Sequence, residues 1–342
     1  MSGDRRKVLV TGGAGYVGAH ACKALAQAGF VPVTYDNLST GRASFVRWGP
    51  LVQGDTRDAE GVADTIRSHD AAAVLHFAAL SSVGESMTDP VAYYANNVDG
   101  LLGVLAGMAK AGVEKLVFSS TAAVYGARGQ QPLDETAAAD PINPYGRSKL
   151  MCEQIMADVA RAGGLKFVAL RYFNASGADP DAEVGEQRAV ETHLIPRAMM
   201  ALQGHIDDFQ VFGADFATPD GTAVRDYVHV SDLADAHVLA LEALLAGGSS
   251  GVFNLGGGRG HSVGEVLDAI RRVTGREMPA ATGARRPGDP EILVADTRAA
   301  QSVLGFRPRR SDLETIVETA WRWHQVAHPL RSRELSLAGE HR

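Results

Sequence analysis

A glycine-rich turn near the start of the chain leaves few folds open to the residues around it. The apolar run 7–11 leads directly into Gly12, Gly15 and Gly18, and a helical pattern follows over 17–28. A strand, a turn with glycines at every third position and a helix form a variant of the dinucleotide-binding fingerprint. The first glycine permits the tight turn, the second lets backbone N–H groups approach a pyrophosphate at the helix N-terminus, and the third allows close packing of helix on strand.

An aspartate downstream of the glycines indicates which dinucleotide the turn would hold. Asp36 follows the β-rich run 31–35, close to the expected ~20 residues beyond the glycines. A carboxylate there accepts hydrogen bonds from the adenosine ribose and would repel a 2′-phosphate, so the pattern predicts NAD rather than NADP. The alternative is an ordinary glycine turn followed by a surface aspartate. Asp55, after the next strand, could reach the adenine amino group or equally cap a helix.

The first half of the chain alternates β-rich runs with amphipathic helical stretches. Strands are expected over 7–11, 31–35, 73–77, 115–119 and 166–171, and the helices between them include 17–28, 89–111 and 145–162. This alternation predicts an α/β fold with a doubly wound parallel sheet, a Rossmann fold, with helices on both faces.

The second half of the chain predicts a smaller, discontinuous domain. The stretch 175–220 is rich in Gly, Pro, Asp and Ala and interrupts the periodicity, whereas a strand and an apolar-striped helix return over 225–245 and a strand follows over 252–255. We therefore expect a dinucleotide-binding domain over 1–174 plus about 225–258, and a substrate-binding domain over about 175–224 plus 259–330. The polar end, 331–342, is expected to be frayed.

Composition and charge exclude several functional classes. A chain of 342 residues with 45% hydrophobic residues can bury a substantial core, and a net charge of -7 gives no reason to expect nucleic acid or an anionic membrane as partner. No stretch approaches a membrane span, and the apolar run behind the basic N-terminus is too short for a signal segment. Cys22 and Cys152 lack metal-ligand spacing. We expect a reduced, cytoplasmic, small-molecule enzyme without a metal.

A tyrosine and a lysine at the start of the expected helix 145–162 form a candidate catalytic pair. Tyr145 and Lys149 are four residues apart, hence on one face about one turn from each other. A cation this close would lower the pKa of Tyr145 from its reference value near ~10 and make it a base near neutral pH. The spacing alone is common on helix surfaces, but here it follows a dinucleotide fingerprint. Upstream, Thr121 places a hydroxyl at the carboxyl edge of the sheet, where doubly wound folds bind ligands.

Several longer segments match one enzyme family. They are VTGGAGYVG at 10–18, DNL at 36–38, HFAA at 76–79, YANN at 94–97, PYGRSK at 144–149, LRYFN at 170–174 and VRDYVHV at 224–230. With these motifs the chain resembles the extended short-chain dehydrogenase/reductase family, and within it the UDP-glucose 4-epimerases, over nearly its whole length.

The resemblance implies reversible 4-epimerisation of UDP-glucose and UDP-galactose. Tyr145 would take the proton of the sugar 4-hydroxyl, with Thr121 sharing that hydrogen bond, while hydride passes from C4 to tightly held NAD. The 4-keto sugar would then turn over, and hydride would return to its opposite face. Lys149 would hold the nicotinamide ribose. The cofactor contacts implied are Gly12, Gly15, Tyr16, Val17, Gly18, Asp36, Asn37, Asp55, Thr56, Phe77, Ala78, Ala79, Asn96, Tyr145, Lys149 and Tyr172.

The same resemblance implies a UDP-sugar site. Its residues would be Thr121, Tyr145, Asn174, His193, Leu194, Val211, Phe212, Arg225, Arg286, Asp289 and Leu293. Asn174, Arg225 and Arg286 would meet the phosphate and sugar region, because a diphosphate needs cations and amide donors. Asp289 would meet a ribose hydroxyl, and 211–212 the uracil. Without the resemblance, Arg225 could simply pair with Asp226, Arg286 could belong to a solvated basic loop, and His193 could be a capped loop residue.

Several alternatives remain open at this point. Relatives restricted to glucose and galactose carry a bulky Tyr where this chain has Leu293, so UDP-N-acetylglucosamine could also be accepted, and a UDP-xylose/UDP-arabinose 4-epimerase would use the same catalytic groups. A 4,6-dehydratase is disfavoured, because 122–123 is Ala-Ala instead of Asp-Glu. A non-catalytic dinucleotide sensor commonly loses the Tyr or the Lys, and both are present here. The family also implies a homodimer through a four-helix bundle of 89–111 and 145–162.

Overall fold

The structure is a computed structural model that describes residues 5–127, 131–278, 280–286 and 289–329. Residues 331–342, expected to be frayed, lie outside this range, as do 287–288 of the basic loop that contains Arg286.

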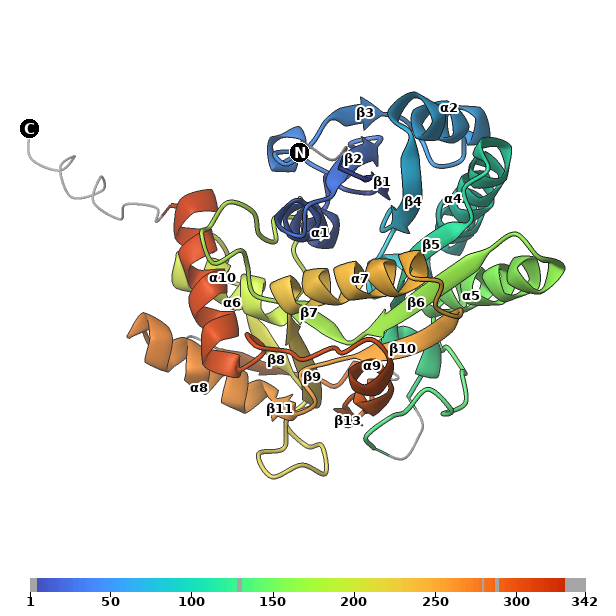
Figure 1. Ribbon diagram of the computed structural model, residues 1–342. Helices are drawn as coiled ribbons and strands as arrows, with labels where there is room; N and C mark the ends of the chain where they lie inside the picture. Colours follow the sequence, from blue (N-terminus) through green and yellow to red (C-terminus); the bar gives the residue numbers. More distant parts are fainter. Residues whose placement is uncertain (1–4, 128–130, 279, 287–288, 330–342) are drawn as a thin grey trace, which may run out of the picture.

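Seven parallel strands form the central sheet, in the order β10-β6-β5-β4-β1-β2-β3 (Figure 1). The strands are β1 (Lys7–Thr11), β2 (Val31–Asp36), β3 (Leu51–Gln53), β4 (Ala71–His76), β5 (Lys115–Thr121), β6 (Lys166–Tyr172) and β10 (Gly251–Leu255). All the strands expected in the first half are present, with bounds within two residues of the expected ones. The predicted doubly wound parallel sheet is confirmed.

Helices cover both faces of this sheet. The helices are α1 (Tyr16–Gln27) and α7 (Val230–Leu245) on one face, and α2 (Ala59–His69), α4 (Pro90–Ala111) and α5 (Pro144–Ala162) on the other, with the short α3 (Val83–Thr88) before α4. Leu25 of α1 and Leu241 of α7 pack with Val117 of the sheet in the first layer. Leu101 of α4 and Met156 of α5 pack with Leu116 of the sheet in the second layer. Burial of these apolar faces holds the layers together.

Local signals fix where two of the helices begin. The Asp58 carboxylate accepts hydrogen bonds from the backbone N–H groups of Glu60 and Gly61 and caps α2, and the Asn143 side chain accepts from the N–H of Gly146 and caps α5. Pro144 is the first residue of α5, a position that does not require an N–H. This cap places the next residue, Tyr145, in the first turn of the helix.

A second, smaller unit lies beside the large sheet. Its strands are β7 (Asn174–Ser176), β9 (Val224–His229), β11 (Gly260–Ser262) and β13 (Ile292–Leu293), together with the pair β8 (Gln210–Phe212) and β12 (Ala281–Gly283). The helices α6 (Leu194–Leu202), α8 (Val263–Thr274) and α10 (Leu313–Ala327) share a core that includes Ile195, Val266 and Ile316. The remaining short elements are η1 (Ala43–Phe45), η2 (Ala122–Tyr125) and α9 (Arg298–Val303).

The second half of the chain differs from the expectation in two places. The stretch 175–220, whose composition interrupts the periodicity, contains α6 and β8. The helix was missed because it is short and has Pro196 in its first turn, next to a loop rich in Gly and Asp. In addition, β9 pairs with β7, β11 and β13 instead of joining the large sheet, so the chain returns to the large sheet with α7, and not near residue 225 as predicted.

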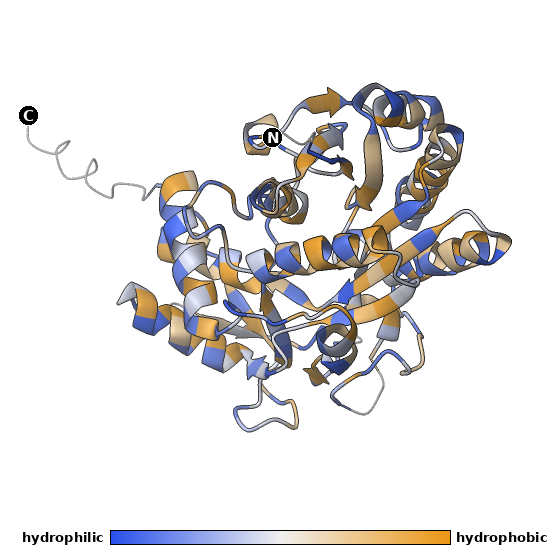
Figure 2. Ribbon diagram, in the orientation of Figure 1, coloured by the Kyte–Doolittle hydropathy of each residue, from blue (hydrophilic) through white to orange (hydrophobic). Residues whose placement is uncertain are grey.

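The helices around the large sheet are amphipathic. Figure 2 shows apolar and polar bands alternating along them, as expected when one side of a helix is buried and the other faces water. None of the helices in the described part of the chain is long and apolar enough to cross a membrane.

Candidate active site

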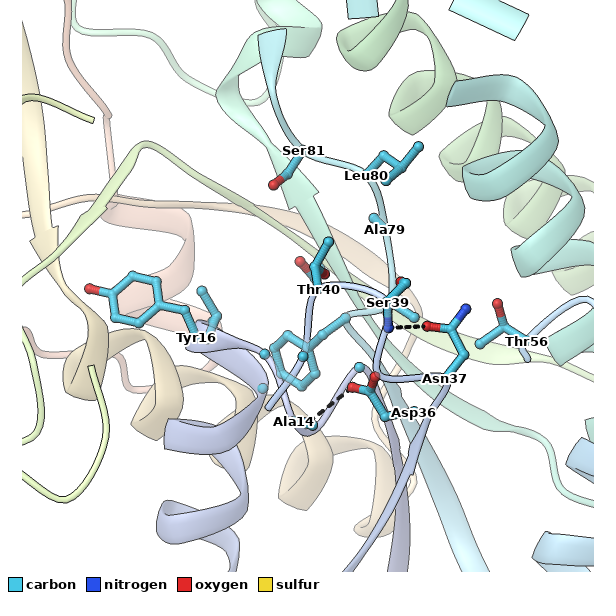
Figure 3. A pocket seen from close by; sticks show the side chains of 18 of the residues that line it. Ala14, Tyr16, Asp36, Asn37, Ser39, Thr40, Thr56, Ala79, Leu80 and Ser81 are labelled. Atoms are coloured by element: carbon cyan, nitrogen blue, oxygen red, sulfur yellow. Dashed lines mark hydrogen bonds between the residues drawn. The ribbon is translucent and has the colours of Figure 1, made fainter. Parts of the chain in front are cut away.

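One pocket at the carboxyl edge of the large sheet brings the expected cofactor residues together. Figure 3 shows part of its lining, with Asp36, Asn37 and Thr56 on one side and Tyr16 on the other. Of the expected cofactor contacts, the lining contains Gly12, Gly15, Tyr16, Val17, Gly18, Asp36, Asn37, Thr56, Phe77, Ala78, Ala79, Asn96, Tyr145, Lys149 and Tyr172. Asp55 is the expected residue that it lacks.

The glycine turn between β1 and α1 allows no side chain at two positions. Gly12 has φ +73°, and a Cβ on it would lie 2.5 Å from the backbone nitrogen of Ala78. A Cβ on Gly18 would lie 2.2 Å from the carbonyl oxygen of Gly12. Gly15 is the N-cap residue of α1 and has no side chain to satisfy the first N–H groups of the helix. The turn therefore exposes backbone donors at the positive end of α1, which suits a pyrophosphate.

Asp36 ends β2 beside the glycine turn. One oxygen accepts a hydrogen bond from the backbone N–H of Ala14 at 3.0 Å (Figure 3). The other accepts from the backbone N–H of Leu38 at 2.8 Å. Burial raises the pKa of Asp36, and these hydrogen bonds oppose the rise. A Cβ on Gly41 would lie 2.8 Å from the carboxylate, so the chain leaves space around it. The position fits a carboxylate that accepts ribose hydroxyls.

Asp55 lies beside the pocket lining and does not cap a helix. Its carboxylate accepts hydrogen bonds from the backbone N–H and from Nε of Arg57, both at 2.9 Å, which lower its pKa. The cap of α2 is Asp58, so the helix-cap role expected as the alternative for Asp55 is wrong. The carboxylate also lies 3.4 Å from Nδ2 of Asn37, and Asn37 lines the pocket, as do the adjacent Gly54 and Thr56.

The Tyr145–Lys149 pair is present, but its electrostatics differ from the prediction. The Lys149 ammonium donates to the carbonyl oxygen of Ser119 at 2.9 Å and lies over the Phe118 ring, and burial lowers its pKa to about 8. Burial raises the pKa of Tyr145, whereas a hydrogen bond with Thr121 and the charge of Arg188 lower it. The predicted lowering by Lys149 is therefore wrong in this structure, because the phenol is desolvated and the ammonium is directed at the sheet.

Two pocket residues missed by sequence reasoning, Gln187 and Arg188, lie in an irregular loop. We call residues 177–188 the strap. Arg188 Nε donates to Glu186 at 2.9 Å, and its Nη1 lies 3.4 Å from the Ser81 hydroxyl. No motif or periodicity marks these residues in the sequence. The lining also contains Ser39, Thr40, Gly41, Arg42, Leu80 and Ser81, which follow β2 and β4 and could have been found from that position at the sheet edge.

Four of the expected UDP-sugar residues form two pairs in the smaller unit. Arg225 of β9 forms an ion pair with Asp289, and the Arg286 guanidinium lies 4.2 Å from the centre of the Phe212 ring. The pairing of Arg225 with Asp226, considered from the sequence, is wrong, because the Asp226 carboxylate accepts backbone N–H groups of 257, 258 and 295. Phe212 belongs to β8, as does Val211.

Leu293 of β13 lies beside Arg225. The two residues are paired in register between β13 and β9, and Leu293 packs partly buried against the apolar cluster that contains Val124 and Phe173. The structure thus places Leu293 next to a residue expected to bind substrate.

Asn174 and His193 are held by the fold. The Asn174 side chain donates to the carbonyl oxygen of Asp226 at 2.9 Å. His193 precedes Leu194, the first residue of α6, and its Nδ1 lies 2.6 Å from the Glu186 carboxylate, whose charge raises the pKa of His193. Because Glu186 also binds Arg188, one carboxylate links His193 to the cofactor pocket.

A Rossmann sheet with this pocket defines an NAD-binding enzyme of the short-chain dehydrogenase type, and comparison with known proteins narrows the class. The chain belongs to the NAD dependent epimerase/dehydratase family, whose model matches residues 8–256. It is 51% identical over 324 residues to UDP-glucose 4-epimerase of Rhizobium leguminosarum bv. trifolii, covering 95% of this chain and 98% of the relative. It is 50% identical over 321 residues to UDP-glucose 4-epimerase of Rhizobium meliloti, with 94% and 98% covered.

Solved structures of UDP-glucose 4-epimerases have the same fold. The crystal structure of the enzyme from Brucella ovis in complex with NAD matches with a TM-score of 0.91 and 52% identity, over 93% of this chain and 98% of that one. The enzyme from Bifidobacterium longum, in complex with NAD+ and UDP, matches with a TM-score of 0.88 and 36% identity, over 94% and 99%. The resemblance to UDP-glucose 4-epimerases is confirmed.

Proposed function

We propose that this protein interconverts UDP-glucose and UDP-galactose by epimerisation at C4, with NAD as its cofactor. The observation that carries the proposal is one continuous pocket that joins the glycine turn and Asp36 to Tyr145 and Lys149. Similarity to UDP-glucose 4-epimerases over more than nine tenths of the chain supports it.

The residues of the pocket fit NAD. The glycine turn leaves room and donors for a pyrophosphate, Asp36 is placed for the adenosine ribose, and Lys149 stands beside Tyr145 at the other end. When bound there, NAD would supply the acceptor for the hydride that leaves C4 of the sugar.

The protein's own groups move the proton. The Tyr145 phenol, hydrogen-bonded with Thr121, would take the proton of the sugar 4-hydroxyl as hydride leaves C4 and give it back when hydride returns. Burial lowers the pKa of Lys149 to about 8, close to neutral pH, so a ligand bound beside the ammonium can change its protonation state. Positioning of these groups before reaction reduces the entropy cost of bringing them together.

The smaller unit supports a UDP-sugar as substrate. Arg225 and Arg286 offer cations for a diphosphate, and the exposed Phe212 ring offers an apolar surface for a flat base. The solved relatives include a UDP-glucose 4-epimerase of Thermotoga maritima with UDP-glucose. The pentose and N-acetyl-sugar alternatives gain no specific support from these contacts.

The test measures conversion of UDP-galactose to UDP-glucose by chromatography, with purified protein and no added NAD. We expect Tyr145→Phe to lose at least about a hundredfold in turnover while retaining bound NAD, because only the proton transfer is removed. Tyr94→Phe is the matched control, since Tyr94 lies outside the pocket lining. Near-normal turnover of Tyr145→Phe would exclude Tyr145 as the base, and a wild-type protein that converts no UDP-sugar would refute the function.

We also propose a homodimer through α4 and α5. Exposed apolar side chains form a stripe on each helix: Val91 and Leu102 on α4, and Met151 and Val159 on α5. The two helices pack against each other, so the stripes lie on neighbouring helices, and the same surface of a second copy would complete a four-helix bundle.

For the domain division we propose the arrangement expected from the sequence, with one change. The NAD-binding domain would comprise the chain up to residue 174 and the segment from α7 through β10, because β10 pairs with β6 in the large sheet. The UDP-sugar-binding domain would comprise the remaining described residues up to the end of α10.

A further inference from the structure

The strap forms one wall of the cofactor pocket. Its last residues, Gln187 and Arg188, line the pocket together with Tyr16 and Arg42. The Tyr16 phenol donates to the carbonyl oxygen of Gly177 at 2.7 Å, and Arg42 Nε donates to the carbonyl oxygen of Gln187 at 3.3 Å. The strap thus touches both the pyrophosphate end of α1 and the loop that follows β2.

The strap also packs between the two structural units. Ala178 and Val184 are buried in a cluster with Ala19 of α1, Phe45 of η1 and Trp323 of α10. Trp323 Nε1 donates to the carbonyl oxygen of Glu186 at 2.9 Å. In Figure 1 this part of the chain runs between α1 and α10. The strap is therefore held from two sides, by α1 of the large-sheet unit and by α10 of the smaller unit.

Lys23 of α1 binds three carboxylates of the strap at once. Its ammonium lies 2.8 Å from Asp179, 2.9 Å from Asp181 and 2.7 Å from Glu183. The Lys23 side chain is 12% exposed and that of Asp179 only 3%. Burial by itself would lower the pKa of Lys23, but the three hydrogen bonds outweigh it and raise the pKa, so the ammonium stays charged.

The arrangement is an intramolecular latch, and Lys23 already fills the place that a divalent cation would take. Three carboxylates within 4.8 Å of one another could hold a metal ion, but here Lys23 Nζ occupies their centre. All three acceptors belong to the strap, so moving the strap away from α1 would break all three ion pairs together. A network of this kind stabilises more than one exposed pair does.

We propose that Lys23 is a positioning residue that holds the strap closed against α1 and thereby retains NAD in its pocket. It touches neither cofactor nor substrate, because it lies outside the pocket lining. It acts through the strap residues Gln187 and Arg188. The inference rests on the proposed function, since it takes NAD as the ligand of the pocket.

The test follows cofactor exchange instead of activity. Purified protein is mixed with an excess of isotopically labelled NAD, and the bound cofactor is released by denaturation at timed intervals and identified by mass spectrometry. The variant is Lys23→Met, and Lys23→Arg tests rescue by a conserved charge. Lys110→Met is the control, because Lys110 of α4 forms an ion pair with Glu60 of α2 and both residues lie outside the lining of the cofactor pocket.

We expect Lys23→Met to exchange NAD about tenfold faster than the wild type, and Lys23→Arg and Lys110→Met to stay within about twofold of it. Because Lys23→Met leaves the buried Asp179 unpaired and could destabilise the fold, Asp181→Asn combined with Glu183→Gln is a second variant that keeps one ion pair. Its exchange should be about threefold faster.

The inference is overturned if Lys23→Met folds and exchanges NAD at the wild-type rate. If Lys23→Met does not fold, exchange at the wild-type rate in the double variant overturns it. It is also overturned if Lys110→Met accelerates exchange as much, because the effect would then be general loosening. A wild-type protein that contains no NAD and takes up none refutes the proposed function and the latch with it.

Discussion

Replacing Arg188 by glutamine should change the pH dependence of the turnover number more than the highest turnover number reached at any pH. The positive charge of Arg188 lowers the pKa of Tyr145, which burial raises. In an effective dielectric constant of about 20, Coulomb's law gives about 2 kcal/mol for any two unit charges roughly 8 Å apart. Glu186, which accepts from Arg188 at 2.9 Å, offsets part of that field. Loss of the charge of Arg188 should therefore raise the pKa of Tyr145 further.

The sign of the effect follows from the role of the phenol. Tyr145 must be deprotonated to act as a base. A higher pKa of Tyr145 therefore lowers activity at acidic pH and leaves activity at high pH unchanged. In Arg188→Gln the acidic limb of kcat against pH should move to higher pH, with a loss of about threefold to tenfold below it. In Arg188→Lys, which keeps the positive charge, the acidic limb should stay at the pH of the wild type. The assay is UDP-galactose conversion across pH, with bound NAD measured in each variant.

Two outcomes would refute this reasoning. An acidic limb at the same pH in wild type and Arg188→Gln would show that the charge does not act on Tyr145. A loss of equal size at every pH, together with reduced bound NAD, would show that Arg188 holds the cofactor or the strap instead.

Two further predictions concern the cofactor turn and the dimer. In Gly18→Ala the new Cβ would lie 2.2 Å from the Gly12 carbonyl oxygen, so the purified protein should contain less NAD and unfold at a lower temperature. Gly84→Ala is the control, because nothing lies within 4 Å of its Cβ, and neither property should change. Normal NAD content in Gly18→Ala would contradict the account of the turn. Leu102→Glu should convert the dimer to a monomer, as measured by size-exclusion chromatography with light scattering. Val303→Glu, at an exposed position on α9, should leave the dimer intact. A monomeric wild-type protein would contradict the proposed dimer.

Local patterns predicted the large sheet because its signals lie within single segments. Most strands of the first half are apolar runs that lead into a turn and a helix, as β1 leads into α1 and β4 into α3 and α4, and burial on both faces favours such runs. Asp36 was found in the same way, from its distance to the glycines and its place at the end of β2. The smaller unit was harder to predict, since α6 and β8 are short and lie among loops.

The sequence by itself determined the Rossmann sheet, the glycine turn and the positions of Tyr145 and Lys149 one helical turn apart. Tertiary structure alone decided what those groups meet. Lys149 binds Ser119 and leaves Tyr145 to burial and Arg188, and Lys23 meets carboxylates more than 150 residues further along the chain. Helical spacing fixes only near neighbours, whereas a pKa or an ion pair depends on desolvation and on charges that folding brings from distant segments.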